Sequence, residues 1–179
     1  MIQRSIVHLT ALLLIPFALA CKNKQPATTD TTVSTPPVVE EGLPRFGGVA
    51  PSDSLFFMLQ RTPCFGACPV YAIKVYRSGF ATYDARANVE LTGQYTGHVK
   101  PEMMEDLLAK TEAYGFFSMN DKYDGQVTDL PSTIIQVATN GRMKKVVSRV
   151  GTPATFKSFA EYAERALMPL KWSPVPAKP

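Results

Sequence analysis

The stretch VYAIKVYRSGFATYDA, residues 70–85, decides the fold. Residues 70–76 place apolar or aromatic side chains at every second position, with Lys74 on the opposite face, which is the pattern of a half-buried strand. Residues 77–79, Arg-Ser-Gly, are typical of a tight turn. Residues 80–85 alternate again. The stretch therefore predicts a β-hairpin.

Further strands are predicted on both sides of this hairpin. Residues 55–60, LFFMLQ, form a short apolar run that is typical of a buried strand. Residues 91–99 contain two glycines, which indicate a bulge or a bend in a strand. Residues 133–139 and 142–150 are joined by Asn140-Gly141, a strong signal for a two-residue hairpin turn.

Two segments predict helices. Pro101 suits the first position of a helix, and Gly115 suits the position just after its end. In the second helix, Thr152 is the expected N-cap, Pro153 is the first helical residue, and Pro169 ends it. At helical spacing, the apolar faces comprise Met103, Met104, Leu107, Leu108 and Thr111 in the first helix, and Phe156, Phe159, Ala160, Ala163, Ala166 and Leu167 in the second.

The predicted order is ββββ-α-ββ-α within one domain, residues 52–170. Because hairpins dominate, we expect an α+β fold with a mostly antiparallel sheet and both helices packed on one face. The proline-rich residues 171–179 are expected to be a disordered tail.

Charge argues against a nucleic-acid partner. The chain carries a net charge of +4, but residues 52–170 contain 13 Lys and Arg against 12 Asp and Glu. A nucleic-acid-binding domain concentrates basic residues on one face, and we find no such cluster beyond Lys144-Lys145.

The N-terminus predicts export. Arg4 precedes an apolar run over residues 5–20 that is shorter than a membrane-spanning helix and ends in small residues before Cys21. Residues 1–20 are therefore predicted to be a signal peptide. The junction resembles a bacterial lipobox, which implies lipidation of Cys21. An ordinary signal peptide with an incidental cysteine and a retained membrane anchor are the alternatives.

Residues 21–51 are predicted to be a lipidated cysteine followed by a disordered tether rich in Thr and Pro, which cannot bury enough apolar surface to fold. Lys22 after Cys21 resembles the enterobacterial signal for outer-membrane sorting. We therefore expect an envelope protein anchored in the outer membrane through its lipid and facing the periplasm.

Cys64 and Cys68 flank a short loop between two prolines, and three interpretations are open. A disulfide suits an oxidising compartment, and its short ring would stabilise the fold by only roughly 2 kcal/mol. A redox couple would more often have two intervening residues at a helix N-terminus. A metal site would need further ligands, of which His98 is the candidate because it is the one histidine outside the signal peptide.

The segment around these cysteines follows the pattern T-P-C-F-G-x-C-P-x-Y, through Thr62, Pro63, Cys64, Phe65, Gly66, Cys68, Pro69 and Tyr71. This motif resembles that of the domain of unknown function family 6438, found in bacterial lipoproteins. Supporting matches are Gly115, Phe116, Phe117, Tyr123, Asp129, Pro131, Asn140, Gly141, Gly151 and Pro153. The resemblance covers about residues 52–168 and implies fold and location but no catalytic residues.

The function expected from these observations is a non-catalytic binding or interaction role, with enzyme activity left open. The candidate contact loop comprises Pro63, Phe65, Gly66, Pro69 and Tyr71. No catalytic residues and no cofactor are predicted, and the partner is either an envelope protein or a ligand of unknown identity. The alternative is a thiol redox or metal-binding module that uses Cys64 and Cys68.

Overall fold

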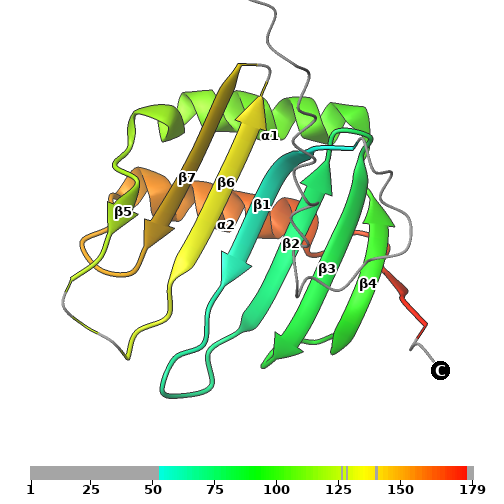
Figure 1. The fold of residues 1–179 in the computed structure, drawn as a ribbon, viewed down its shortest axis with the longest axis horizontal. Helices are drawn as coiled ribbons and strands as arrows, with labels where there is room; N and C mark the ends of the chain where they lie inside the picture. Colours follow the sequence, from blue (N-terminus) through cyan, green and yellow to red (C-terminus); the bar gives the residue numbers. More distant parts are fainter. Residues whose placement is uncertain (1–52, 126, 128, 140, 177–179) are drawn as a thin grey trace, which may run out of the picture. The chain divides into compact units, whose positions relative to one another are not determined.

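The structure is a computed structural model that describes residues 53–176 except 126, 128 and 140 (Figure 1). The predicted signal peptide, Cys21 and the tether lie outside the described residues. No helix in the described part of the chain has the length and apolar character needed to cross a membrane.

One eight-stranded sheet forms the framework, with strand order β5-β7-β6-β1-β2-β3-β4-β8. All neighbouring strands are antiparallel except β5 and β7, which are parallel. The strands are β1 (Leu55–Arg61), β2 (Val70–Tyr76), β3 (Phe80–Ala87), β4 (Gly93–His98), β5 (Lys122–Tyr123), β6 (Thr133–Thr139), β7 (Arg142–Ser148) and β8 (Ser173–Pro174). The mixed α and β content and the mostly antiparallel sheet agree with the predicted class.

The hairpin predicted from residues 70–85 is present as β2 and β3. Ile73 lies opposite Tyr83, and Lys74 lies opposite Thr82. Gly79 closes the turn with a φ of 82°, a left-handed conformation that glycine adopts without steric cost. The alternation predicted for β2 is also observed, because every second side chain from Tyr71 is buried.

Two helices, α1 (Pro101–Ala113) and α2 (Ala154–Leu167), lie behind the sheet in Figure 1. α2 buries an apolar stripe and packs across β1, where Phe57 and Phe159 meet edge to face with ring centroids 6.1 Å apart. α1 buries only Leu107 and Thr111 fully, so its methionines are less covered than the predicted apolar face implies.

The start of α2 also differs from the prediction. Pro153 occupies the N-cap position, one residue later than the predicted N-cap Thr152, and no side chain caps the helix. The Thr152 hydroxyl instead shares a hydrogen bond with the hydroxyl of Ser148 at the end of β7. Thr152 therefore joins the helix entrance to the sheet.

Three short elements are missing from the predicted ββββ-α-ββ-α order. They are the 3₁₀ turn η1 (Phe116–Ser118), β5 in the expected loop, and β8 near the C-terminus. The sequence predicts a disordered tail from residue 171, whereas Ser173 and Pro174 pair with β4, and the ring of Trp172 lies 5.2 Å from that of Tyr83. A two-residue strand has no periodicity for a sequence pattern to detect.

Candidate functional site

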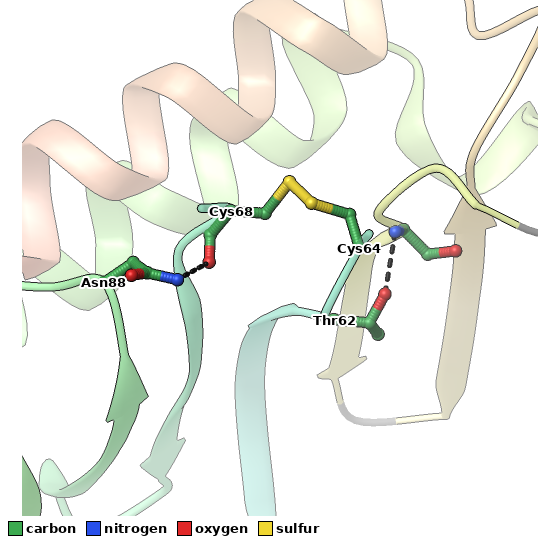
Figure 2. Close-up of a disulfide and its surroundings, with 5 residues drawn as sticks. Thr62, Cys64, Cys68 and Asn88 are labelled. Carbon is green, nitrogen blue, oxygen red and sulfur yellow. Dashed lines mark hydrogen bonds between the residues drawn. A yellow bond between two sulfur atoms is a disulfide. The ribbon is translucent and has the colours of Figure 1, made fainter. Parts of the chain in front are cut away.

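The candidate site lies at the end of the sheet where β1 leads into β2. Cys64 and Cys68 form a disulfide there, with their Cα atoms 5.8 Å apart (Figure 2). No helix begins between residues 62 and 69. The disulfide therefore closes an irregular loop between two strands, as the first of the three interpretations predicts.

Hydrogen bonds fix both ends of this disulfide loop, residues 62–69. The Thr62 N–H donates to the Ser132 carbonyl over 3.0 Å, and the Ser132 N–H donates to the Thr62 hydroxyl over 2.8 Å. At the other end, the Asn88 amide donates to the Cys68 carbonyl over 2.9 Å (Figure 2). The loop is thus tied to the segments before β6 and after β3, which lie far from it in the sequence.

The tip of the disulfide loop presents an aromatic ring to solvent. The side chain of Phe65 is 95% exposed, although its N–H donates to the Asp129 carbonyl over 3.4 Å. Four large hydrophobic residues are exposed in the described part of the chain, and Val127 and Leu130 are two of the others. Three of the four therefore belong to two loops that are hydrogen-bonded to each other.

The second of these loops, residues 124–132, is held by Arg149. Its guanidinium donates to the Val127 carbonyl over 3.0 Å and to the Ser132 hydroxyl over 3.1 Å, and it lies 3.4 Å from the Asp124 carboxylate. Lys122 and Arg149 hold the pKa of Asp124 below its ordinary value, chiefly through the hydrogen bond from Lys122. The exposed apolar surface therefore rests on a tethered backbone.

Beneath the disulfide loop, Arg61, Tyr71 and Glu164 form a polar cluster. Arg61 Nε donates to Glu164 Oε1 over 2.8 Å, and the Tyr71 hydroxyl donates to the same oxygen. Arg61 Nη1 also donates to the Thr133 hydroxyl over 2.6 Å. The cluster joins the end of β1, the start of β2 and the last turns of α2.

The electrostatics of this cluster keep Arg61 and Tyr71 protonated at neutral pH. Burial, reinforced by the hydrogen bond to Glu164 and by its charge, raises the pKa of Tyr71 well above its ordinary value. Burial alone would lower the pKa of Arg61, but its contacts with Glu164 and Tyr71 outweigh that effect, and the pKa is raised. Tyr71 is consequently a hydrogen-bond donor here and is not suited to act as a base or nucleophile.

A cavity of about 590 Å³ opens beside this cluster. The volume falls within the range of small-molecule sites, which is roughly 300–1,000 Å³. Its lining comprises Arg61, Cys68, Pro69, Tyr71, Val89, Pro131, Glu164, Arg165 and Met168. The lining thus combines one side of the disulfide loop, the C-terminal end of α2 and the loops that flank the sheet.

The predicted contact residues divide between the surface and the core. Pro63, Phe65, Gly66 and Pro69 are exposed, and Pro69 also lines the cavity. Tyr71 is only 2% exposed, because its ring packs edge to face on Tyr83 with centroids 5.9 Å apart. Tyr71 therefore supports the loop and is not part of its outer surface.

The alternative metal set is not brought together. His98 lies opposite Phe80, at the start of β3, in the pairing of β4 with β3. The Cys68 carbonyl instead accepts a hydrogen bond from Asn88, just beyond the end of β3. At about 3.3 Å per residue, the length of β3 separates His98 from the cysteines by roughly 20 Å. Among the described residues, no three His, Cys, Asp or Glu side chains are grouped so as to hold a metal ion.

The sequence interpretation missed Arg61 and Glu164. A signal for both was present, since alternation places Arg61 on the same strand face as Phe57 and Leu59. Glu164 lies four residues after Ala160, at the margin of the apolar stripe of α2. A charge at a core-facing position calls for a partner, because an unpaired buried charge is costly. Nothing in the sequence identified which acid that partner is.

The fold and the site together define a small α+β domain with a disulfide-closed loop beside a cavity. The chain belongs to the family described as Domain of unknown function (DUF6438), whose model matches residues 56–167. No curated protein matches the chain. The family membership agrees with the resemblance seen in the sequence and assigns no activity.

Proposed function

We propose that the domain is a non-catalytic binding module whose contact surface is the tip of the disulfide loop. The observation that carries this proposal is Phe65, an aromatic side chain that is 95% exposed on a backbone closed by a disulfide. A ring that stays in water does not stabilise the fold, whereas full burial of a phenylalanine side chain contributes roughly 1.5–3 kcal/mol to stability. Solvent exposure of Phe65 is therefore accounted for if a partner covers it.

The tethering of the loop supports the same role. Binding is normally weakened by the free-energy cost of ordering loops, which is about 0.5–1.5 kcal/mol for each immobilised side chain. Here the disulfide, Asn88 and Ser132 have already fixed the loop in the free protein. Val127 and Leu130 are also exposed, on the loop whose Asp129 carbonyl accepts a hydrogen bond from the Phe65 N–H. A fixed aromatic anchor with apolar neighbours is the usual composition of a binding hot spot.

We further propose that the domain acts in the bacterial envelope, held there by lipid on Cys21. The support is the signal-like sequence before Cys21 and an oxidised cysteine pair, which persists in compartments outside the cytoplasm. Intact-mass measurement of protein from the membrane fraction tests the anchor. The expected mass is that of a chain that begins at Cys21 and carries acyl chains. The mass of an unacylated chain that begins at another residue contradicts lipidation.

Site-specific photocrosslinking in intact cells tests the binding proposal. A photoreactive phenylalanine analogue replaces Phe65 in one variant and Met143 in a control, because Met143 is also exposed but lies on β7. We expect a discrete adduct from position 65 that is absent from position 143. The adduct should weaken when Cys64 and Cys68 are both changed to Ser. Adducts of equal pattern from both positions, or none from position 65, would refute the proposed contact surface.

A further inference from the structure

The cavity beside the disulfide loop is a second candidate binding site, and Phe65 is not among the residues that line it. We propose that this cavity binds a small amphipathic anion with an apolar body and one carboxylate, and that Arg165 binds the carboxylate. The proposal rests on the charge balance of the lining and on its apolar remainder.

The positive and negative side chains that line the cavity do not balance. Arg61 and Glu164 are bonded to each other, and the Tyr71 hydroxyl is bonded to the same carboxylate. This polar wall is therefore internally neutral. Arg165 is the remaining charged residue of the lining, and its guanidinium forms no hydrogen bond or ion pair with the described part of the chain. The cavity consequently carries one uncompensated positive charge, which favours an anionic ligand.

The chemistry of that charge favours a carboxylate. A guanidinium presents a planar fork of N–H donors that matches the two oxygens of a carboxylate. A single arginine balances a single negative charge, so a monoanion fits the lining better than a multiply charged group. Arg165 is exposed at the cavity and can reach a headgroup without the cost of desolvating a buried guanidinium.

The other lining residues suit an apolar body. Pro69, Val89, Pro131 and Met168 contribute hydrocarbon and thioether surface, and Cys68 contributes half of the disulfide. Methionine adapts readily to different apolar shapes. Because small-molecule sites are mostly apolar with a few polar groups that fix orientation, this lining has the composition expected for such a ligand.

The structure provides its own reporter for occupancy. Trp172 is the single tryptophan of the chain, and its indole N–H donates to the Met168 carbonyl over 3.2 Å. Met168 lines the cavity, so a bound ligand alters the surroundings of the indole. The experiment titrates the full-length chain with decanoate and follows Trp172 emission. Decanol, which has the same chain length without the charge, is titrated in parallel.

We expect saturable binding of decanoate and weaker binding of decanol. Arg165→Gln should weaken decanoate binding about tenfold, since hydrogen bonds to charged groups are the stronger class. Arg165→Lys should retain part of the affinity, because it keeps the charge but loses the fork. Lys145→Gln is the matched control, since it removes an exposed positive charge on β7, outside the cavity, and should leave the affinity unchanged.

Each opposite result overturns the proposal. Equal affinity for decanol and decanoate would mean that the charge plays no part. Equal losses in Arg165→Gln and Lys145→Gln would mean that net charge, and not the cavity, governs binding. An absence of saturable binding to the folded chain would remove the site altogether. Phe65→Ala should leave the decanoate affinity unchanged, so failure of this proposal and failure of the loop proposal can be told apart.

Discussion

The two ends of the sheet are built differently. At one end, β2 turns into β3 through Gly79, and β6 turns into β7 through Gly141, both with φ near 85°. At the other end, the disulfide loop and the loop before β6 are long, irregular and joined by hydrogen bonds across 70 positions of sequence (Figure 1). The turn end depends on local backbone conformation, whereas the loop end depends on distant contacts and carries the candidate site.

Of the substitutions that compare the two ends of the sheet, Gly79→Ala should have the largest effect on stability. A Cβ atom at this position would lie 2.6 Å from the Val99 carbonyl oxygen, and the φ of 82° disfavours any L side chain. The left-handed conformation costs about 1–2 kcal/mol, and the overpacking costs a further 1–3 kcal/mol. We expect Gly79→Ala to lower the free energy of unfolding by about 3 kcal/mol, measured by urea denaturation.

Gly141→Ala is the matched control for this effect. Its φ is 89°, but among the described residues, apart from its chain neighbours, no atom lies within 4 Å of an added Cβ. The expected loss is therefore only the conformational cost of about 1–2 kcal/mol. If the two alanine variants lose the same stability, close packing at the β2–β3 turn contributes nothing and the turn end is purely local.

At the loop end, removal of Glu164 should have the largest effect. Glu164→Ala leaves the guanidinium of Arg61 and the hydroxyl of Tyr71 without their common acceptor. Lost hydrogen bonds to charged groups cost about 1.5–3 kcal/mol, and the partial exposure of the Arg61 and Glu164 side chains, 29% and 26%, places the expected loss near 2 kcal/mol. Thermal and urea unfolding measure it.

Glu161→Ala provides the comparison on the same helix. Glu161 is exposed on α2, so its loss should change stability by no more than about 0.5 kcal/mol. Equal effects of the two substitutions would show that the cluster adds no stability beyond helix propensity. The loop end would then be held by backbone hydrogen bonds and the disulfide alone.

The turn end and the central strands could be predicted from sequence because their signals are local. The bounds of β2 and β6 agree with the prediction at both ends, since alternation and the flanking turn residues define them. The start of α1 at Pro101 was also predicted correctly, because proline suits a first helical turn. In these segments a window of about ten residues contains the information that fixes the backbone.

The loop end could be predicted only in part. The cysteine pair, together with the predicted export, indicated the disulfide as one of three interpretations, and the pattern of prolines and Gly66 indicated a loop. The pairing of Arg61 with Glu164 depends on how α2 crosses the sheet, 103 positions further along the chain. The cavity depends on residues from five separate segments, and no pattern in one segment encodes it. β8 and β5 are too short for periodicity to reveal.

Removal of the disulfide should cost less than removal of Glu164. The ring spans residues 64–68, and the chain-entropy model gives about 2 kcal/mol as an upper estimate for so short a closure. In the Cys64→Ser and Cys68→Ser double variant, we expect a loss of about 1–2 kcal/mol with the fold retained. Unfolding followed by Trp172 emission measures it. A loss above about 4 kcal/mol would show that the disulfide supports the whole domain and not the loop alone.

Tyr71→Phe should lower the free energy of unfolding at neutral pH by less than removal of the disulfide does. It should also change how the free energy of unfolding falls at alkaline pH. Because the folded-state pKa of Tyr71 lies above the ordinary value of 10.0, the folded protein holds this proton more tightly than the unfolded chain. Its stabilising contribution is complete below about pH 10 and is lost as the pH rises toward the folded-state pKa. Wild-type stability should therefore fall above pH 10 more steeply than that of Tyr71→Phe.

Urea unfolding at pH 8 and pH 10.5 tests this difference. Burial also raises the pKa of Tyr76 and of Tyr83, so the variant should retain part of the alkaline decline. The loss at pH 8 should be about 1–1.5 kcal/mol, the usual contribution of one hydrogen bond. Identical slopes in the two proteins would mean that burial and the contact with Glu164 do not raise the pKa of Tyr71 in the folded protein.

Phe65→Ala should have the smallest effect on stability, and this is the most informative of the comparisons. The ring is 95% exposed, so its truncation removes almost no intramolecular contact, and the free energy of unfolding should change by no more than about 0.5 kcal/mol. Phe156→Ala is the opposite case, because that ring is 1% exposed and its loss should cost about 3–5 kcal/mol. A large loss from Phe65→Ala would mean that the ring packs within the domain in solution and is not available to a partner. An unchanged stability together with a lost photocrosslink at this loop, probed from Pro63, would separate the contribution of Phe65 to binding from any contribution to folding.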